Sequence, residues 1–332
     1  MRNTPSTSPA NTHTEGFPPS PPEAHPKAKG GFDIRQQVTD KIIAMLETGN
    51  NQGGERWTRA AGRGMPCNGT TGQAYRGVNV LLLWSEAMER GYGSNLWMTY
   101  KQATSIGAQV RKGQTGTMCV YFDMLKRKGT GAVTGTSTSA EDEEASFFPM
   151  CKPFWLFNVA QIDGLPESFN TPAPVQTDFT AIEAAEQLIA ASGATIHHGF
   201  DTAFYSIAKD QICLPDRERF TSPENYYSVA VHELTHWSGH ESRLARQFGK
   251  RFGTEAYAFE ELVAELGSAF LCGHIGFVDA TIEGHASYLQ GWLTVLKNDK
   301  TAIFTAAKQA SLAYDFILEK AGMKADAGAL VK

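Results

Sequence analysis

The sequence of 332 residues lacks several features on which whole classes of protein depend. Its longest apolar run, residues 80–84, is far shorter than the roughly 18 residues that a membrane-spanning helix needs. The first 31 residues lack the apolar core of a secretory signal peptide and are instead rich in Pro, Ser and Thr. These absences disfavour membrane and exported proteins, and we expect a cytoplasmic protein without membrane contact.

Cysteine is also scarce, and the chain contains no Cys-x-x-Cys pair. The five cysteines are Cys67, Cys119, Cys151, Cys213 and Cys272. An odd number of scattered cysteines fits a reducing compartment. It argues against both a disulfide scaffold and a zinc site made of thiolates.

The net charge of −5 conceals a difference between the two halves of the chain. Residues 1–165 carry 17 basic and 14 acidic side chains, whereas residues 166–332 carry 13 and 21. The basic excess is concentrated in residues 51–128, with 11 basic and 4 acidic side chains. A basic module joined to an acidic one indicates two different tasks in one chain.

Hydrophobic periodicity and turn residues predict an α+β protein with two domains. Residues 1–31 read as a disordered tail, and residues 32–165 as a first domain with a mobile loop at 129–146. The Pro-rich stretch 166–178 reads as a linker before a second domain at 179–332. The pattern predicts helices near 34–46, 78–90, 99–106, 179–192, 223–236, 257–272, 280–296 and 300–321. It predicts strands at 117–124, 154–162, 195–198, 204–207 and 211–214, the first two of them paired.

One predicted helix of the second domain carries the pattern His-Glu-x-x-His, from His232 to His236. Histidines four residues apart lie on one helix face, so both imidazoles can bind a single metal ion. Glu233 lies beside them, where a carboxylate can take a proton from water that the metal activates. A helix with two packed or exposed histidines is the alternative, but it gives Glu233 no task. We predict a divalent metal ion, zinc by preference, with Glu233 as the general base.

The next predicted helix offers a third metal ligand. Glu261 and Glu265 share one face of an otherwise apolar helix, and buried carboxylates need a cationic partner. The pattern E-x-x-A-E resembles that of gluzincin-like peptidases, which implies Glu261 as the ligand and Glu265 as acceptor from a histidine N–H. The reverse assignment stays open, and His240 is a further alternative. The metzincin pattern fails, because its last histidine would fall at Ser242.

The basic module of the first domain interleaves cationic and aromatic side chains. Single-stranded nucleic acid binds through contacts to phosphates and through base stacking on aromatic rings. The candidates for phosphate contacts are Arg59, Arg76, Lys101, Arg111 and Lys112, and those for stacking are Trp57 and Tyr75. Trp84 falls in an apolar run and is predicted to belong to the core. An ordinary solvated face over an aromatic core would explain the same composition equally well.

Several motifs together resemble a known family. Residues 38–43, 68–72, 75–84, 97–103 and 107–113 resemble the N-terminal domain of ArdC-type antirestriction proteins, a domain related to part of the conjugative primases of the TraC type. Residues 232–240, 243–244 and 260–266 resemble the zincin-like metallopeptidase domain that follows it in ArdC proteins. The resemblance implies that the first domain binds single-stranded DNA, and that the protein protects incoming plasmid DNA from host restriction during conjugation.

Two functional hypotheses remain open. The first is an antirestriction protein that binds single-stranded DNA and carries a metal-dependent, peptidase-like domain. The second is a DNA-targeted zinc metallopeptidase whose main activity is proteolysis of a protein in the host restriction pathway. A purely structural metal site is disfavoured, because such a site has no use for Glu233.

Overall fold

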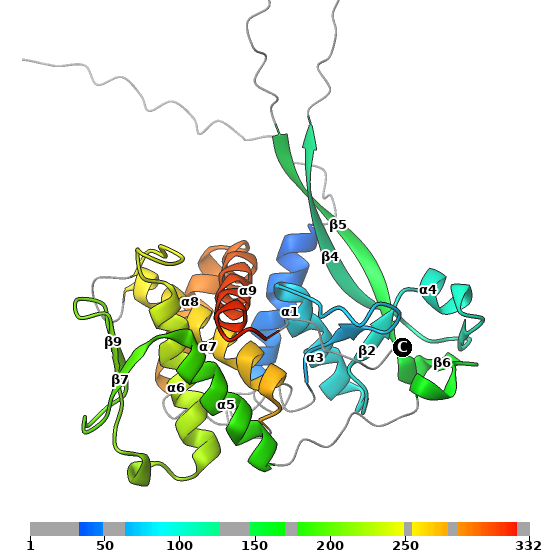
Figure 1. The fold of residues 1–332 in the computed structure, drawn as a ribbon. Coiled ribbons are helices and arrows are strands. Elements are labelled where there is room, and N and C mark those ends of the chain that lie inside the picture. Colours follow the sequence, from blue (N-terminus) through cyan, green and yellow to red (C-terminus); the bar gives the residue numbers. More distant parts are fainter. Residues whose placement is uncertain are drawn as a thin grey trace, which may run out of the picture. The chain divides into compact units, whose positions relative to one another are not determined.

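The computed structural model describes six stretches of the chain, residues 33–48, 64–126, 147–169, 178–248, 254–277 and 285–323. The predicted tail at 1–31, the candidates Trp57 and Arg59, and the predicted loop at 129–146 lie outside these stretches. Of the predicted linker at 166–178, the structure describes residues 166–169 and 178. From Ile34 onward the chain forms one compact unit (Figure 1).

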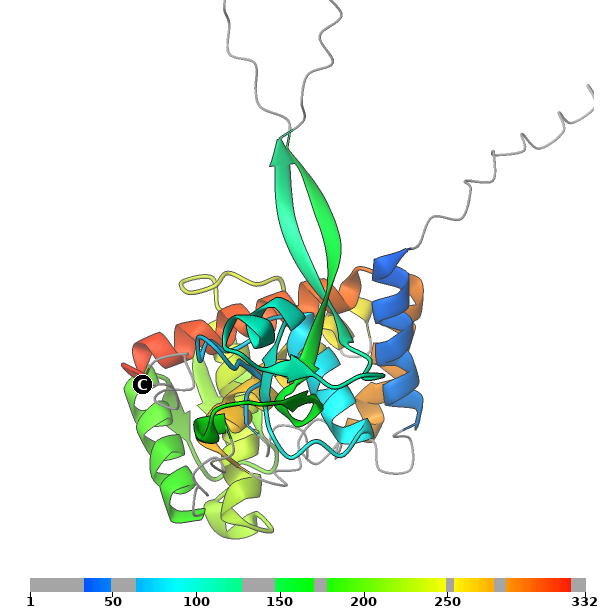
Figure 2. The ribbon, with the colours of Figure 1, turned by 90° about the vertical axis from the view of Figure 1, so that its right-hand side faces the viewer.

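The first half of this unit combines helices with small sheets. Its elements are α1 (Ile34–Thr48), β1 (Cys67–Asn68), α3 (Val78–Glu89), β2 (Leu96–Met98), α4 (Tyr100–Ser105), β3 (Gln109–Val110), β4 (Thr117–Lys126), β5 (Phe147–Asn158) and β6 (Ile162–Asp163). Four strands form a sheet in the order β1-β2-β5-β4, and β3 pairs with β6. The predicted pairing of the two long strands is confirmed: β4 and β5 form an antiparallel hairpin, with Thr117 opposite Leu156 (Figure 2).

The end of the second long strand differs from the prediction. The sequence pattern predicted a strand over 154–162, but β5 ends at Asn158 and a 3-10 turn, Val159–Gln161, follows it. The Asn158 side chain accepts from the backbone N–H of Ala160, and its own backbone N–H donates to the Gln161 side chain at 2.9 Å. This reciprocal cap stops the strand, and the chain resumes as β6 against β3.

The second half is mostly helical and carries one three-stranded sheet. Its elements are α5 (Asp178–Ser192), β7 (Thr195–His197), β8 (Phe204–Ser206), β9 (Gln211–Cys213), α6 (Pro223–Ser238), α7 (Glu255–Ile275), α8 (His285–Asn298) and α9 (Ala302–Lys320). The strand order is β7-β9-β8, so β8 is an edge strand. Each predicted helix and strand of this half is present, with bounds that shift by a few residues among the described positions.

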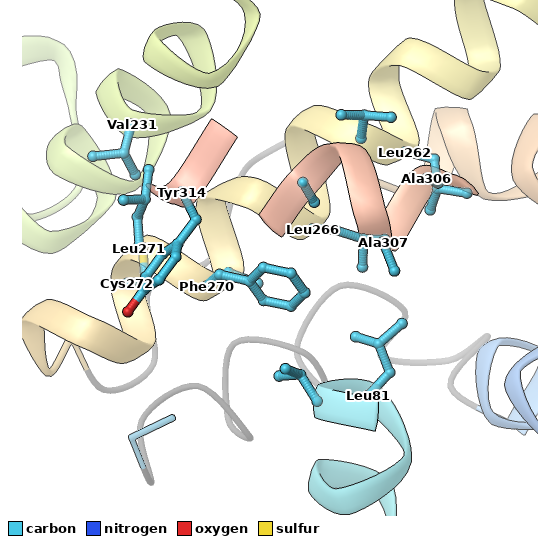
Figure 3. Close-up of a cluster of buried hydrophobic side chains, with 14 of the residues drawn as sticks. Leu81, Val231, Leu262, Leu266, Phe270, Leu271, Cys272, Ala306, Ala307 and Tyr314 are labelled. Atoms are coloured by element: carbon cyan, nitrogen blue, oxygen red, sulfur yellow. The ribbon is translucent and has the colours of Figure 1, made fainter. Parts of the chain in front are cut away.

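One hydrophobic core joins the helices of both halves. It takes Leu81 and Trp84 from α3 together with Leu266 and Phe270 from α7, and it extends to Ala307 of α9. Leu81 and Phe270 belong to the buried cluster of Figure 3, and the ring centroids of Trp84 and Phe270 lie 5.9 Å apart. The predicted place of Trp84 in the core is confirmed, since its side chain is 2% exposed.

Polar contacts also link the two halves. The Thr39 hydroxyl donates to the backbone carbonyl of Lys300 at 2.8 Å, and the backbone N–H of Gly77 donates to the Ser311 hydroxyl at 2.9 Å. Lys297 pairs with Glu47 at 2.7 Å. Helices α8 and α9 thus hold α1 and α3 by both apolar and polar contacts. Among the described helices, none combines the length and the hydropathy that crossing a bilayer requires.

Candidate metal centre

Helix α6 carries the His-Glu-x-x-His pattern in its second half. The helix begins after Ser222, whose side chain accepts from the backbone N–H of Asn225 at 3.2 Å, and Pro223 occupies its first turn. From Val231 to Ser238 every residue of the helix is buried. The two histidines are therefore presented toward a neighbouring helix instead of toward solvent.

That neighbour is α7, and a glycine lets the two helices approach closely. A Cβ atom built on Gly267 would lie 2.5 Å from Cγ2 of Thr235 on α6, which no real pair of atoms tolerates. Thr235 is fully buried at this crossing point. The missing side chain of Gly267 sets the helix separation, and this separation brings the histidines of α6 within reach of the glutamates of α7.

Three side chains meet across this contact with the donor set of a zincin. Nε2 of His232 lies 3.5 Å from Oε2 of Glu261, and Nε2 of His236 lies 3.7 Å from Oε1 of the same carboxylate. The three ligand atoms all lie within 4.8 Å of one another. Ligand atoms about 2.1 Å from a tetrahedral ion are about 3.4 Å apart, so the spacing fits one cation among the three.

The other ring nitrogen of each histidine, Nδ1, faces a further carboxylate, and this carboxylate differs between the two histidines. Nδ1 of His232 lies 3.7 Å from Oε2 of Glu265, and Nδ1 of His236 lies 3.2 Å from Oε1 of Glu260. Such outer carboxylates fix the orientation and tautomer of metal-binding histidines. The structure brings Glu261 together with both Nε2 atoms, leaves Glu265 facing Nδ1 of His232, and adds Glu260 as a further outer carboxylate; the assignment of the third ligand stays a prediction.

The electrostatics of the cluster also favour a cation. Burial alone would lower the pKa of His232, but Glu261 and Glu265 outweigh it and raise that pKa to about 10. The pKa of His236 rises to about 9 against the same effect of burial, chiefly through Glu260 and Glu261. Carboxylates that hold protons on buried imidazoles this strongly would also attract a divalent ion into the same place.

Glu233 lies at the junction between α6 and the edge strand β8. Burial raises the pKa of this carboxyl group, while His232 and His236 act in the opposite direction. The backbone of Tyr205 in β8 acts in the same direction as the two histidines and lowers this pKa. A buried carboxylate beside the histidine pair can take a proton from a nearby water, which is the task predicted for Glu233.

The other histidines take up different positions. Nδ1 of His240 interacts with the Ser242 hydroxyl at 2.8 Å, and His240 is not part of the metal-type cluster found in the described residues. His274 is partly buried and meets the Tyr314 hydroxyl at 2.9 Å. Among the alternatives for the third ligand, the cluster therefore favours Glu261 over His240.

Comparison with known proteins agrees with this geometry. Residues 32–157 match the family model for the N-terminal domain of anti-restriction factor ArdC, and residues 183–309 match that for a zincin-like metallopeptidase. The crystal structure of the metal-free antirestriction ArdC protein from the R388 plasmid is 38% identical, with a TM-score of 0.72, over 88% of this chain and 100% of that one. The chain belongs to the ArdC family of antirestriction proteins. The two matches also establish its two-domain, α+β architecture.

Further relatives of this ArdC-family chain include larger proteins. The DNA primase TraC of Escherichia coli is 38% identical over 86% of this chain, which spans only 27% of TraC. The protein y4eC of Sinorhizobium fredii is 36% identical over 86% of this chain and 91% of its own length. A Mn(II)-bound structure of the R388 ArdC protein, 38% identical with a TM-score of 0.70, matches 87% of this chain and 98% of that one. Together with the donor set, that structure supports a divalent metal ion at the histidine cluster.

The described DNA-binding candidates of the ArdC-type first domain are scattered, and three of them are already engaged. Arg76 forms an ion pair with Asp315, and Arg111 pairs with Asp163 at 3.1 Å. Tyr75 is half-buried, with its hydroxyl 3.4 Å from the backbone carbonyl of Trp97. The prediction that these residues contact DNA stays a prediction.

The two predicted lysines, Lys101 and Lys112, are exposed. The sequence analysis did not single out three aromatic residues as stacking candidates, although the structure exposes them. Trp155 of β5 is 49% exposed, Tyr121 of β4 57% and Tyr100 of α4 51%. No periodic signal separates the two strand residues, Trp155 and Tyr121, from core aromatics, because the pairing of β4 and β5 decides which of their positions are exposed.

Sequence analysis also missed the partners that hold the metal-type cluster in place. Glu260 adjoins Glu261, but neighbouring helix positions point about 100° apart, so spacing did not suggest a shared site. Arg246, which binds Glu260 at 2.8 Å, comes from a loop 14 positions earlier. Loop residues follow no period, and no local signal marked this one.

Proposed function

We propose that this chain is an antirestriction protein that binds single-stranded DNA, protects incoming plasmid DNA during conjugation, and hydrolyses peptide bonds with its second domain. The observation that carries the peptidase part is the meeting of His232, His236 and Glu261 around one position, with Glu233 buried beside them. The antirestriction part rests on membership of the ArdC family. We place the protein in the cytoplasm, where host restriction acts.

The second domain has the parts that peptide hydrolysis requires. The two histidines and Glu261 would hold a divalent ion, zinc in our proposal, which would polarise a peptide carbonyl and make water more nucleophilic. Glu233 accepts the proton of the attacking water and passes it to the leaving amine. Burial beside the two histidines keeps the Glu233 carboxylate close to the water that it would deprotonate.

The edge strand β8 supports a peptide as the substrate. One side of β8 pairs with β9, and among the described strands none pairs with its other side. Extended peptides bind such edges by adding a strand. Phe204 of β8 is 41% exposed and Ile207, just after it, is 46% exposed. They offer apolar contacts to side chains of a bound peptide.

Exposed aromatic rings on both faces of the β4–β5 hairpin, and an exposed lysine beside one of them, support single-stranded DNA as the partner of the first domain. Residues 90–122 contain four basic side chains and no acidic one. Trp155 lies against Gly116, where an added Cβ would be 3.1 Å from the Trp155 Cβ, and Lys152 is paired with Tyr121 across the strands. Rings beside cations are the features that bases and phosphates of a single strand require.

The variant Glu233→Gln distinguishes protection by DNA binding from protection by proteolysis. Plasmid transfer into restricting and non-restricting recipients is measured with wild type and with this variant, and metal content serves as the control for the site. Retained metal with lost protection would assign protection to the peptidase, our alternative of a DNA-targeted zinc metallopeptidase. Retained metal with full protection would show that DNA binding suffices. Equal transfer with and without the wild-type protein would refute the antirestriction function.

A further inference from the structure

The loop at 239–248, which leaves the end of α6, contacts both walls of the candidate metal site. Two arginines three positions apart lead to different partners. Arg246 reaches the glutamate wall on α7, and Arg243 reaches the hairpin β8–β9. Both side chains are almost fully buried, with 3% and 11% exposure. Arginine is seldom buried unless its guanidinium is paired, and both of these are.

Arg246 is held on every side of its guanidinium. It donates to Glu260 through Nη2 at 2.8 Å and through Nε at 3.1 Å. It also donates to the backbone carbonyl of Thr235 at 2.6 Å and to the Ser238 hydroxyl at 2.9 Å. Glu260 in turn faces Nδ1 of His236. Arg246 therefore ties the end of the histidine helix to the carboxylate that orients one of its histidines.

The absence of a side chain at Gly239 permits this arrangement of Arg246. Its backbone is right-handed, with φ of −82°, so conformational freedom does not explain a glycine there. An added Cβ would lie 2.7 Å from both Cζ and Nη2 of Arg246. The loop also closes on itself, because the Arg246 backbone N–H donates to the Gly239 carbonyl at 2.8 Å. The missing side chain makes room for the guanidinium.

Arg243 binds the other wall. It holds Asp210 with both terminal nitrogens, one of them at 3.0 Å, and Nη2 lies 3.2 Å from the Tyr205 hydroxyl. Its guanidinium lies 4.0 Å from the ring centroid of Trp237 on α6. Asp210, in the turn between β8 and β9, has a left-handed backbone with φ of 49°, which a non-glycine residue adopts only when its contacts hold it there.

The two arginines therefore contact different parts of the site. Arg246 binds the carboxylate that faces His236, and Arg243 binds the turn that follows the edge strand β8. Tyr205, which Arg243 helps to hold, belongs to the edge strand β8, and this strand contacts the histidine helix α6. Phe248 at the end of the loop lies between the walls, with its ring 6.1 Å from that of Tyr205 and 6.3 Å from that of His236. The loop connects the histidine helix, the glutamate helix and the edge strand.

We propose that the loop at 239–248 is the positioning element of this site: Arg246 orients His236 through Glu260, and Arg243 fixes the edge strand β8 through Asp210. The planar fork of arginine suits both tasks, because it binds a carboxylate through two parallel hydrogen bonds. Loss of a partner behind a metal-binding histidine typically lowers metal affinity about 10- to 100-fold. The inference rests on the proposed metal site but not on peptide hydrolysis.

The test measures two properties in the full-length protein: the affinity for Mn(II) by calorimetry, and amide hydrogen exchange of residues 203–213. Arg246→Leu should weaken Mn(II) binding about 10- to 100-fold and leave the exchange of the hairpin unchanged. Arg243→Leu should speed exchange in the hairpin about tenfold or more, with little change in Mn(II) affinity. Arg219→Leu, which removes an exposed arginine paired with Asp201, is the matched control and should change neither.

Two results would overturn the inference. One is wild-type affinity for Mn(II) in folded Arg246→Leu, and the other is unchanged hairpin exchange in Arg243→Leu. If Arg246→Leu does not fold, Glu260→Gln removes the carboxylate that links Arg246 to His236, at nearly equal volume, and must weaken Mn(II) binding. Absence of any peptidase activity would refute the proposed hydrolysis. The Mn(II) affinity and the hydrogen exchange of the hairpin would still test the role of the loop.

Discussion

The candidate metal site and the candidate DNA-binding surface are built in different ways. The metal site consists of buried side chains on two packed helices, and both ring nitrogens of each histidine face a carboxylate. The DNA candidates lie on strands, on a short helix and in loops, mostly exposed, and Arg76 and Arg111 are occupied by ion pairs. A metal needs donor atoms placed within a few tenths of an ångström, whereas a flexible strand adapts to scattered cations and rings. Spacing in the sequence therefore reveals the first kind of site far better than the second.

The strongest test of this contrast removes the metal site alone. The double variant His232→Ala and His236→Ala should lose stoichiometric metal, measured by elemental analysis after exposure to Zn²⁺ or Mn²⁺ and removal of free ions. Because these side chains lie far from the exposed aromatics in the sequence and share no contact with them, affinity for single-stranded DNA should stay within about twofold of wild type. His197→Ala, at an exposed position of β7, is the control and should keep its metal. Full metal content in the double variant would refute the site.

A second test asks whether the two regions are independent in stability. Trp84→Ala removes a ring packed on Phe270 and should cost about 3–5 kcal/mol of unfolding free energy, as large core truncations do. Because the core is shared, hydrogen exchange should accelerate together in β4–β5 and in α6–α7. Leu312→Ala, at a position 41% exposed, is the control and should have little effect. Acceleration confined to the first region would contradict a shared core.

The features that could be predicted from the sequence are those that lie within single helices, as the ligands of the metal site do. Helices α3, α6 and α7 were predicted because apolar residues recur at helical spacing and glycines mark their ends. The left-handed Gly276, with φ of 83°, ends α7 three residues after the predicted end. The histidine pair and the two glutamates were predicted because positions four apart share a helix face. Geometry within one element is encoded locally.

Tertiary partners were not predictable from such patterns. Arg246 meets Glu260 only after a loop folds back over the end of α6, and Gly239, which ends that helix, also leaves space for this arginine. Tyr75 is a stacking candidate by sequence, but its hydroxyl contacts Asn68 of β1 and a backbone carbonyl of β2, and its ring is half-buried. Its buried hydroxyl has a pKa raised by desolvation. Such contacts depend on which elements meet, and no single segment carries that information.

A third test sharpens the claim that helix separation creates the metal site. Gly267→Ala puts a Cβ against Thr235 and should cost about 1–3 kcal/mol, as overpacking does, while also weakening metal binding. Thr235→Ser removes the Cγ2 atom that the new Cβ would strike, so the double variant should recover much of both losses. Gly93→Ala, where an added Cβ meets no atom within 4 Å, is the control. Equal metal affinity in Gly267→Ala and wild type would show that the helix contact is not what positions the ligands.

A fourth test concerns stacking on the exposed Trp155 ring of the hairpin. Trp155→Ala should weaken binding of a labelled single strand by about 1–3 kcal/mol, the usual contribution of one stacked base. Tyr75→Phe should change little, because the Tyr75 ring is half-buried and the change removes only its hydroxyl. Fluorescence anisotropy on the full-length protein is the measurement, since the shared core makes an isolated first domain unsuitable. Wild-type affinity for the single strand in Trp155→Ala would refute the stacking role of Trp155.

The smallest expected effect distinguishes cations that are available to DNA from those already paired. Each phosphate neutralised on a single strand contributes about −0.7 to the slope of log affinity against log salt. Lys112→Ala should therefore make the slope shallower by about 0.7, because Lys112 is exposed and loses a direct contact. Arg111→Ala should change the slope less, since the Arg111 side chain must leave Asp163 before it can meet a phosphate. An equal change for both variants would mean that the ion pair opens without cost when DNA binds, and a larger change for Arg111→Ala would make the paired arginine the true phosphate contact.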